Sequence, residues 1–366
     1  MPFLLDLPWY TKAMKHVMIA AGGTGGHIYP ALALADYLKQ EGVRVTFIGS
    51  SQRLESTLIP EHGYRLIAMD IETTQGGIVH KIAYLITMLK AIRETKNLLK
   101  QEQPDACIGF GNYISVPLII AAHQLGIPTM ISEQNSYAGK ANVFLGRFAD
   151  AVELAYERSE KDFDSKKVRV LGNPQASVSA SIQKNPKLLE EYGLDANRPL
   201  VTVPMGSLGS ASVSKIIDEA CARFGDFQVL IAAGKKNPYT FTTENPNVVI
   251  RDYVDGAGML KLSDLAICRA GATTLAEIAT AGVPSVLIPS PFVPNNHQYY
   301  NALELSEHGA AVLLEEKDLT PELLADTVNK LMNDSEGRKK MQTAAREMGK
   351  PNACADTADW LKELCK

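Results

Sequence analysis

Short apolar runs alternate along the chain with longer segments in which apolar residues recur every three or four positions. The runs predict buried strands, and the longer segments predict amphipathic helices. In the first half the predicted strands are 16–21, 43–48, 64–69, 106–110, 129–132 and 151–155. The predicted helices between them lie near 28–41, 53–62, 78–101, 114–125 and 139–148. This alternation is typical of a doubly wound parallel α/β sheet.

The same pattern begins again after Asn173-Pro174 and a polar, serine-rich stretch at 175–186. Further strands are predicted at 200–203, 228–232, 248–250, 265–268, 285–288 and 311–314. A length of 366 residues also exceeds what one ordinary core supports. The sequence therefore predicts two Rossmann-like domains in tandem, facing a cleft.

Composition narrows the class of protein. Apolar residues make up 46% and charged residues 21%, which are globular values. The net charge of −4 disfavours a nucleic-acid binder. Five cysteines without a C-x-x-C pair suit a reducing cytosol, and seven scattered histidines show no metal-ligand spacing. The first 13 residues lack the basic start of a signal peptide, and glycines and prolines interrupt the uncharged segment 106–132, which favours a soluble sheet over a membrane span.

Residues 265–302 combine strands with polar groups that could hold a ligand. The strand at 265–268 breaks at Arg269-Ala270-Gly271, and Thr273 and Thr274 then open a helical pattern. A second strand leads into a polar turn at 295–298. Open α/β sheets bind ligands at the carboxyl ends of their strands, and a helix N-terminus suits phosphate. This stretch therefore predicts a nucleotide site.

A purely structural interpretation of the same residues stays open at this point. Thr274 and Glu277 also have the spacing of a capping box, in which two side chains satisfy the first N–H groups of a helix. His297 and Gln298, taken singly, are typical polar loop residues.

Glycine turns follow three other predicted strands, at 22–26, 109–111 and 206–209. Glycine lets the backbone approach a phosphate or a sugar. The first turn is not a dinucleotide fingerprint, because Ile28 occupies the third glycine position and the second strand ends in Gly49-Ser50 without an acidic residue. Such turns are ordinary singly, but together they favour a shared site and disfavour a nicotinamide cofactor.

Seven motifs, read together, resemble those of the MurG family of bacterial peptidoglycan glycosyltransferases (glycosyltransferase family 28). They are GGTGGH at 22–27, GFGNY at 109–113, EQN at 133–135, LGNP at 171–174, GSLGS at 206–210, RAGATTLAE at 269–277 and HQYYNA at 297–302. The resemblance covers nearly the whole chain from His16. It implies the GT-B fold, with an acceptor and membrane-side domain at 1–172, a UDP-N-acetylglucosamine-binding domain at 173–349, and a helix near 350–366 that packs back on the first domain.

The resemblance also implies a reaction and its partners. Such enzymes move N-acetylglucosamine, with inversion, from UDP-N-acetylglucosamine to the 4-hydroxyl of the undecaprenyl-linked muramoyl-pentapeptide, lipid I. The product is lipid II, the disaccharide precursor of the cell wall. We expect no cofactor and no dedicated metal, because DFD at 162–164 lies among lysines and is typical of a solvated loop. The family works with the machinery of cell-wall synthesis, cell shape and division.

The resemblance assigns roles to individual residues. His27 is the candidate base, and Glu277 would accept hydrogen bonds from the ribose. The uracil would meet the backbone of Val254. Further donor-side residues are Thr24, Gly25, Gly26, Asn135, Ser207, Thr273, Thr274, His297 and Gln298, with Asn135 on the acceptor-side domain. Gly23 and Tyr113 are expected on the acceptor side.

Three departures from the family pattern concern phosphate binding. Met205 and Asn112 stand where glycine is usual, and Gln175-Ala176 follow Asn173-Pro174 without the usual arginine. Two other functions stay open: another GT-B enzyme, such as a diacylglycerol glycosyltransferase, or a binding module without catalysis.

Residues 78–100 predict a helix that docks on the cytoplasmic face of the plasma (inner) membrane. Its apolar band consists of Ile78, Ile82, Leu85, Ile86, Leu89 and Ile92. The surrounding cations are Lys81, Lys90, Arg93, Lys96 and Lys100. The uncharged run 82–89 is too short to span a bilayer but suits a helix lying on an anionic membrane surface. The alternative is a core helix whose band faces the sheet.

Overall fold

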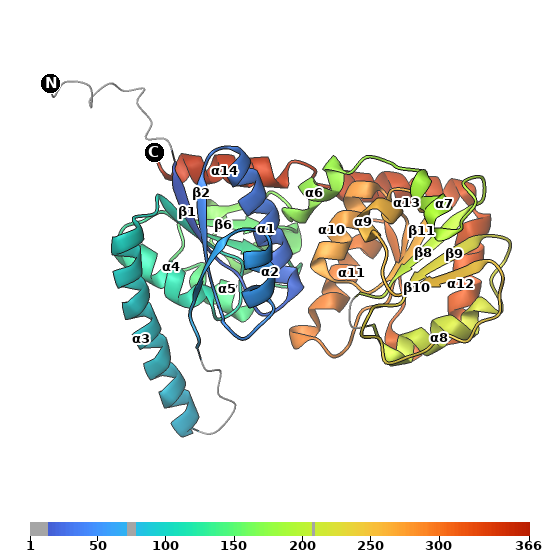
Figure 1. Cartoon of the computed structure of the whole chain (residues 1–366), viewed down its shortest axis with the longest axis horizontal. Coiled ribbons are helices and arrows are strands. Elements are labelled where there is room, and N and C mark those ends of the chain that lie inside the picture. Colours follow the sequence, from blue (N-terminus) through green and yellow to red (C-terminus); the bar gives the residue numbers. More distant parts are fainter. Residues whose placement is uncertain (1–13, 72–77, 207–208) are drawn as a thin grey trace. The chain divides into compact units, whose positions relative to one another are not determined.

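The computed structural model describes residues 14–71, 78–206 and 209–366, without the side chains of 78, 79 and 81. The chain divides into two units (Figure 1). The first consists of Met1–Gln175 with Asn352–Lys366, and the second of Ala176–Pro351.

The first unit is built on a seven-stranded parallel sheet in the order β3-β2-β1-β4-β5-β6-β7. Its strands are β1 His16–Ala20, β2 Arg44–Gly49, β3 Arg65–Ala68, β4 Ala106–Gly109, β5 Thr129–Glu133, β6 Ala151–Leu154 and β7 Val168–Val170. Its α-helices are α1 Gly25–Gln40, α2 Glu55–Glu61, α3 Ile78–Glu102, α4 Ser115–Gln124, α5 Lys140–Leu145 and α14 Ala353–Leu364. Two 3₁₀ turns, Glu157–Asp162 and Ser165–Lys167, precede β7.

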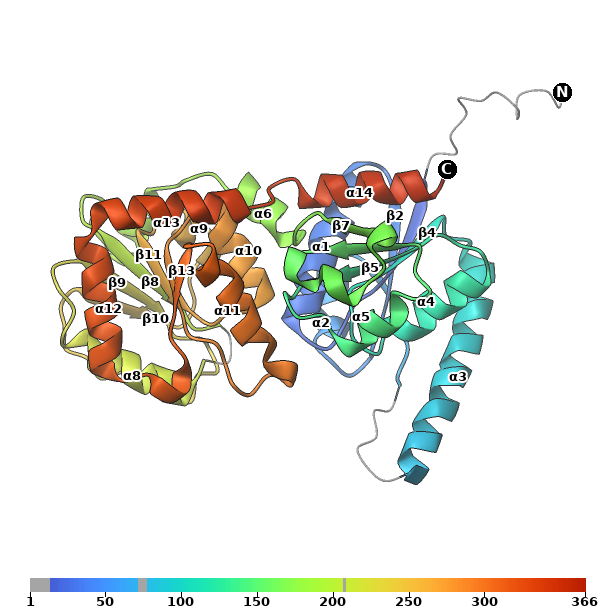
Figure 2. The same cartoon turned by 180° about the vertical axis from the view of Figure 1, so that it is seen from behind.

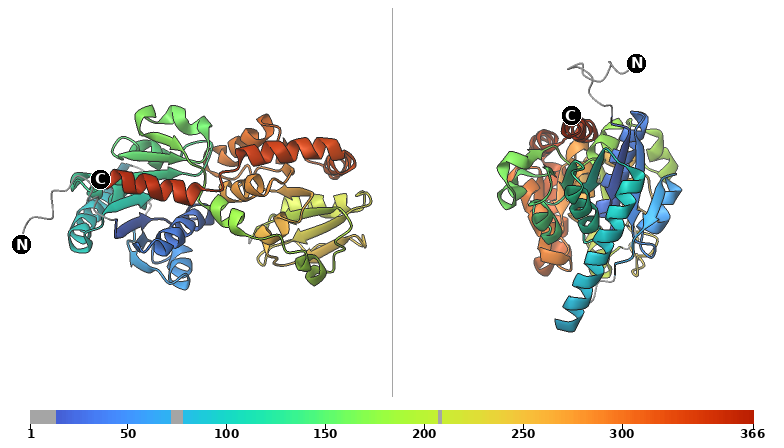
Figure 3. Two further views of the ribbon diagram at one scale, coloured as in Figure 1. Left: turned by 90° about the horizontal axis from the view of Figure 1, so that it is seen from above. Right: turned by 90° about the vertical axis from the view of Figure 1, so that its left-hand side faces the viewer.

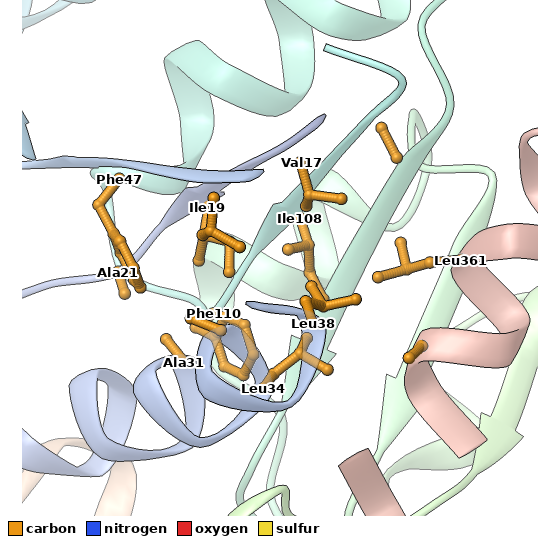
Figure 4. Close-up of a cluster of buried hydrophobic side chains, with 14 of the residues drawn as sticks. Val17, Ile19, Ala21, Ala31, Leu34, Leu38, Phe47, Ile108, Phe110 and Leu361 are labelled. Atoms are coloured by element: carbon orange, nitrogen blue, oxygen red, sulfur yellow. The ribbon is translucent and has the colours of Figure 1, made fainter. Parts of the chain in front are cut away.

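Alternate residues of each strand feed cores on opposite faces of this sheet, as the pleat requires. Val17 and Ile19 join the core under α1 and α14, whereas Met18 and Ala20 join the core under α3 and α4. Figure 4 shows Leu34 and Leu38 of α1, with Leu361 of α14, around the first of these cores. Buried strands of this kind carry near-continuous apolar runs, which is why their positions were predictable.

The last helix of the chain, α14, completes the first unit. Leu361 is fully buried, and the Arg169 guanidinium of β7 lies 4.6 Å from the centre of the Trp360 ring. Thr357 Oγ1 donates a hydrogen bond to Glu153 Oε1 on β6 at 3.2 Å. The helix therefore serves as a layer of the first sheet although it follows the whole second unit in sequence.

Helix α3 presents two different faces. Met88, Ala91 and Leu99 are buried in the first unit, and the helix packs against α4. On the opposite face Ile82, Leu85, Ile86 and Leu89 are 54–62% exposed. Figures 2 and 3 show the N-terminal half of the helix extending beyond the sheet of its unit.

The prediction that Ile92 belongs to the exposed apolar band of α3 is therefore wrong. Ile92 is partly buried and packs against three of the core clusters, so it belongs to the inward face. The Ile78 side chain lies outside the described residues.

The second unit repeats the architecture with six parallel strands in the order β10-β9-β8-β11-β12-β13. These are β8 Leu200–Pro204, β9 Gln228–Ala232, β10 Val248–Arg251, β11 Leu265–Cys268, β12 Ser285–Leu287 and β13 Ala311–Leu313. Its α-helices are α6 Gln175–Ser181, which straddles the boundary, α7 Lys187–Tyr192, α8 Ala211–Cys221, α9 Gly256–Leu260, α10 Ala272–Ala281, α11 His297–Glu307, α12 Pro321–Asn333 and α13 Ser335–Met348. Pro294–Asn296 and Glu316–Asp318 form 3₁₀ turns.

The structure corrects the sequence prediction in three places. Strand β7 was not predicted, because it is three residues long and only partly buried. The serine-rich stretch at 175–186 contains helix α6. Helix α1 begins at Gly25, three residues earlier than predicted, which brings His27 into its first turn.

Glu153 is expected to make the stability of the first unit depend on pH. It is fully buried, and burial raises the pKa of its carboxyl to about 7, against hydrogen bonds from Ser132 and Thr357 that lower it. Because the folded pKa exceeds the unfolded one, this group favours folding below about pH 4.5 and costs stability as the pH rises through 7.

Glu153→Gln should therefore stabilise the protein at pH 8, by an amount on the order of 3 kcal/mol or less, and much less at pH 5. Urea unfolding at the two pH values measures this, with the exposed Glu61→Gln on α2 as the control. An equal effect of Glu153→Gln at both pH values would contradict the assignment.

Candidate active site

In both sheets the strand order reverses beside the first strand, and at such a point the connections leave toward opposite faces. In the first unit this point lies between β1 and β4. The turns that follow these strands are GGTGGH at 22–27 and GFGNY at 109–113. In the second unit it lies between β8 and β11, where the turns at 206–210 and 269–271 follow. The predicted glycine turns thus lie at the position where open α/β sheets bind ligands.

The first turn is held by a buried carboxylate that the sequence did not single out. Glu55, which is 1% exposed, accepts hydrogen bonds from Gly23 N at 3.0 Å and Ser50 N at 3.1 Å. A Cβ on Gly22 would overlap this carboxylate, and Gly23 has a φ of +88°. These two glycines are therefore required by the packing of the turn itself.

Helix α1 presents its N-terminus directly after this turn. Thr24 is the N-cap residue, with extended backbone and an exposed side chain. Gly25 and Gly26 supply the first N–H groups of the helix, which have no partner within it. Such groups, together with the helix dipole, favour an anion or a developing negative charge.

His27 contacts the second glycine turn. A Cβ on Gly111, whose φ is +92°, would lie 3.1 Å from His27 Cε1 and 3.3 Å from Asn142 Nδ2. Glycine at this position therefore lets the imidazole and the Asn142 amide lie close together over the turn. The Nδ1 atom of His27 is buried.

Asn112 replaces the glycine usual in the family and adopts the left-handed conformation itself, with a φ of +65°. Asparagine tolerates this region better than most residues. Its Nδ2 donates to Gly22 O at 3.3 Å, and its Oδ1 accepts from Tyr113 N at 2.6 Å. Asn112 therefore ties the second turn to the first.

The EQN segment ends β5 and is organised by Glu133. This carboxylate is 2% exposed and accepts four hydrogen bonds. Asn135 N and Nδ2 donate to Oε1 at 3.0 and 3.1 Å, and Gly139 N and Asn142 Nδ2 donate to Oε2 at 2.8 and 2.9 Å. Asn135 is thereby fixed beside Glu133. Asn142 was not predicted, because asparagine inside a short helical segment carries no sequence signal.

Tyr113 lies apart from this cluster of polar groups. Its ring is partly buried, and burial raises the pKa of its hydroxyl. The Arg53 guanidinium lies 5.6 Å from the ring centre. Tyr113 therefore lies beside Arg53 and Asn112.

In the second unit, helix α10 begins at Ala272 with Gly271 as its N-cap residue, and no side chain caps it. The capping-box interpretation of Thr274 and Glu277 is therefore wrong, because Thr274 already lies inside the first turn. Glu277 follows Thr274 by three positions and Thr273 by four, so it lies one helical turn beyond both threonines on the same side of α10. Thr273 Oγ1 is buried and has no hydrogen-bond partner within the described residues.

Val254 is anchored by its side chain. It is 7% exposed and belongs to a core cluster with Leu230 and Met259. Asp255 accepts a hydrogen bond from Gly258 N at 3.0 Å and so caps α9 directly after it. The backbone of Val254 is thus held by a buried side chain on one side and a helix cap on the other.

His297 and Gln298 begin helix α11, and the prediction that they lie in a polar turn is wrong. The two residues before them, Asn295 and Asn296, are both left-handed, with φ of 55° and 52°. His297 Nδ1 donates to Pro294 O at 2.9 Å, which leaves Nε2 as the acceptor nitrogen. Gln298 Oε1 accepts from Ser290 N at 2.9 Å and so fixes the preceding loop.

An ion pair that the sequence did not predict holds the neighbouring turns. Arg269 donates to Glu316 Oε2 at 2.6 Å, to Ile288 O at 3.2 Å and to Ser210 Oγ at 2.8 Å. Ser212 Oγ also donates to Glu316, at 2.6 Å. This pair connects the ends of β11 and β12 with the end of the turn at 206–210.

Ser207 of that turn and Met205 directly before it were both singled out from the sequence. Ser207 lies outside the described residues. Met205 is 6% exposed and packs into the core of the second unit, so its side chain points away from the turn. Within the described residues, no group of three or more His, Cys, Asp or Glu side chains could hold a metal ion. That no metal takes part stays a prediction.

Two Rossmann-like sheets, whose strand orders correspond over six strands, each with glycine turns and helix N-termini at its reversal point, define the GT-B class of fold. Family models match both halves. The glycosyltransferase family 28 N-terminal domain matches residues 17–153, and the C-terminal domain of that family matches 200–357. The chain belongs to glycosyltransferase family 28 and, within it, to the MurG family.

The relatives are full-length matches. A protein of Limosilactobacillus fermentum is 36% identical over 359 residues, which cover 95% of this chain and 98% of the relative. One of Bacillus cytotoxicus is 36% identical over 367 residues, covering 96% and 99%. Both are named UDP-N-acetylglucosamine–N-acetylmuramyl-(pentapeptide) pyrophosphoryl-undecaprenol N-acetylglucosamine transferase.

Solved structures agree with this assignment. The crystal structure of Acinetobacter baumannii MurG has a TM-score of 0.80 and 30% identity, over 95% of this chain and 99% of that one. The glycosyltransferase of kitacinnamycin, at 16% identity and a TM-score of 0.71 over 94% and 98% of the two chains, shares the fold alone.

Proposed function

We propose that this protein transfers N-acetylglucosamine from UDP-N-acetylglucosamine to the 4-hydroxyl of undecaprenyl-pyrophosphoryl-N-acetylmuramoyl-pentapeptide, converting lipid I to lipid II with inversion. The observation that carries the proposal is full-length similarity to transferases named for these substrates, at 36% identity. The glycine turns of both units support it, because they lie at the reversal points of the two sheets.

The donor binds to the second unit. The N-terminus of α10, with Thr273 and Thr274, suits the diphosphate, because helix N–H groups and hydroxyls donate to phosphate oxygens. Thr273 Oγ1 supports this role, since a buried hydroxyl without a partner costs stability unless a ligand engages it. Glu277, less than two turns further along the same face, accepts from the ribose hydroxyls.

The remaining donor contacts come from one loop and from two helix N-termini. The Val254 backbone meets the uracil, since the buried side chain fixes its position. His297 and Gln298 contact the sugar from the first turn of α11. Thr24, Gly25 and Gly26 contribute from the first unit, at the N-terminus of α1.

The reaction is a single displacement without a covalent intermediate. His27 accepts the proton of the acceptor hydroxyl as its oxygen attacks the anomeric carbon, and UDP departs with the electrons of the broken bond. The leaving group gains negative charge, which helix N-termini and hydroxyl donors stabilise without a dedicated metal. Gly23 and Asn135 lie on the acceptor side with His27, and Tyr113 lines the same side.

The first test is the reaction itself. Incubation with radiolabelled UDP-N-acetylglucosamine and lipid I should give a labelled lipid with one added hexosamine, whereas diacylglycerol in place of lipid I should give none. Transfer to diacylglycerol would indicate a different lipid glycosyltransferase. Donor binding without transfer to either lipid would indicate a binding module.

Glu277→Gln should weaken UDP binding by about 1.5–3 kcal/mol, the usual range for hydrogen bonds to a charged group. Isothermal titration calorimetry with UDP and with 2′-deoxy-UDP measures this, and the loss should be smaller for the deoxy ligand, which lacks one of the two ribose hydroxyls. Glu219→Gln, at a half-exposed position on α8, is the matched control. An equal loss of binding free energy for both ligands would show that Glu277 does not bind the 2′-hydroxyl.

We further propose that the enzyme is peripheral on the cytoplasmic face of the membrane and docks through α3. None of the described helices is long and apolar enough to cross a membrane. The four exposed residues Ile82, Leu85, Ile86 and Leu89 have the spacing of one helix face, while Lys90 and Arg93 are exposed beside them. Apolar burial and attraction to anionic lipid then act together.

Leu85→Ser combined with Leu89→Ser should reduce co-sedimentation with anionic liposomes by tenfold or more, since each exposed leucine contributes about 1.5–3 kcal/mol when buried. Leu323→Ser with Val178→Ser removes apolar residues that are 39% and 38% exposed on the second unit, and this control should bind liposomes normally. Transfer to a short-chain acceptor should persist. Unchanged liposome binding by the α3 variant would place the docking surface elsewhere.

A further inference from the structure

The Asn142 side chain has a fixed orientation with one unused oxygen. It lies on α5 and is 2% exposed. Its Nδ2 donates to Glu133 Oε2 at 2.9 Å and to Ser132 O at 3.2 Å. Both partners are acceptors only, so the amide cannot be reversed without losing both bonds. Its Oδ1 therefore points away from them, is buried, and has no hydrogen-bond partner within the described part of the chain.

This oxygen belongs to the side chain that lies beside the candidate base. A Cβ built on Gly111 would lie 3.1 Å from His27 Cε1 and 3.3 Å from both His27 Nδ1 and Asn142 Nδ2. The Nδ1 atom is buried, so Nε2 is the ring nitrogen able to meet a substrate hydroxyl. The Asn142 amide group and the buried ring nitrogen of His27 thus both lie close to one point above Gly111.

We propose that Asn142 is a positioning residue for His27. In the reacting enzyme its Oδ1 accepts the Nδ1–H of the imidazole, a bond that is not formed in the structure. This bond selects the tautomer whose Nε2 is unprotonated and orients the ring toward the acceptor. The inference rests on the proposed function, because it concerns the base of that reaction. Glu133 fixes the orientation of the amide by accepting the hydrogen bond from Asn142 Nδ2.

The proton balance explains the use of an amide at this position. The acceptor hydroxyl gives its proton to His27 Nε2 while its oxygen bonds to the anomeric carbon and the bond from that carbon to UDP breaks. The imidazolium then carries a proton on each nitrogen, and Asn142 Oδ1 receives the bond from Nδ1. Asn142 keeps its own protons and stays neutral throughout.

A carboxylate in direct contact with the ring would act differently. It would raise the pKa of His27 and favour the protonated ring, which cannot accept a proton. The charge of Glu133 is instead shared among four donors from three residues, Asn135, Gly139 and Asn142. Asn142 thus contacts Glu133 with its amide N–H and presents a neutral group, not a carboxylate, to the side on which His27 lies.

Steady-state kinetics of the full-length protein test the coupling. His27→Ala should lower kcat by about 10²- to 10⁴-fold, the usual contribution of a general base. Asn142→Ala should lower kcat by about tenfold or more with the donor KM within about twofold, because the interaction matters mainly in the transition state. The double variant should be no slower than His27→Ala, since Asn142 acts through His27. Asn245→Ala, which removes a partly buried amide that bonds Cys221 O in the second unit, is the control and should retain activity.

A second measurement needs no substrate, so its outcome is independent of the proposed reaction. The ring of His27, labelled at Cε1, is titrated by NMR and assigned by its absence in His27→Ala. Asn142→Ala should lower the pKa of His27 by about half a unit to one unit, because the charged ring loses an acceptor. An unchanged titration in a folded Asn142→Ala, or a double variant whose loss equals the product of the single losses, would overturn the proposal.

Discussion

The parallel direction of every strand is the constraint on which the sites of both units depend. In a parallel sheet all carboxyl ends meet at one edge, and each following helix begins at that edge with its N–H groups unpaired. The strand order places β1 beside β4 and β8 beside β11, where successive connections diverge. Only backbone turns with little side-chain volume fit there, which explains Gly23 and Gly111 at positive φ. Anion binding at these positions thus follows from topology before any side chain is considered.

Most of the fold was predictable because its strands are buried on both faces and read as continuous apolar runs. Strand β7 was missed because its sequence, Val-Arg-Val, contains no continuous apolar run: its central Arg169 packs on Trp360 of α14. In the sites, residues within glycine turns were predictable, but Glu55, Arg269, Glu316 and Asn142 were not. Their roles arise from contacts between segments up to 104 positions apart, and a single sequence does not show such pairs.

The departures from the family pattern are absorbed in different ways. Asn112 takes the backbone conformation that glycine would have had and adds a hydrogen bond to the first turn. Met205 contributes its side chain to the core of the second unit. Met205 thus keeps its side chain out of the turn, whereas Asn112 packs its side chain against the first turn, where a Cβ on Gly23 would overlap it. A glycine missing from a motif therefore does not by itself remove the backbone conformation that the motif encodes.

Helix α14 imposes an order on folding during synthesis. The core of the first unit includes Trp360 and Leu361, which leave the ribosome only after all of the second unit. At bacterial elongation rates the intervening residues take roughly ten to thirty-five seconds to make. Throughout that time the nascent first sheet exposes the apolar surface that α14 will cover. The second unit, in contrast, can already form its own core. The first unit thus reaches its native core only after α14, which follows the second unit in sequence, has been made.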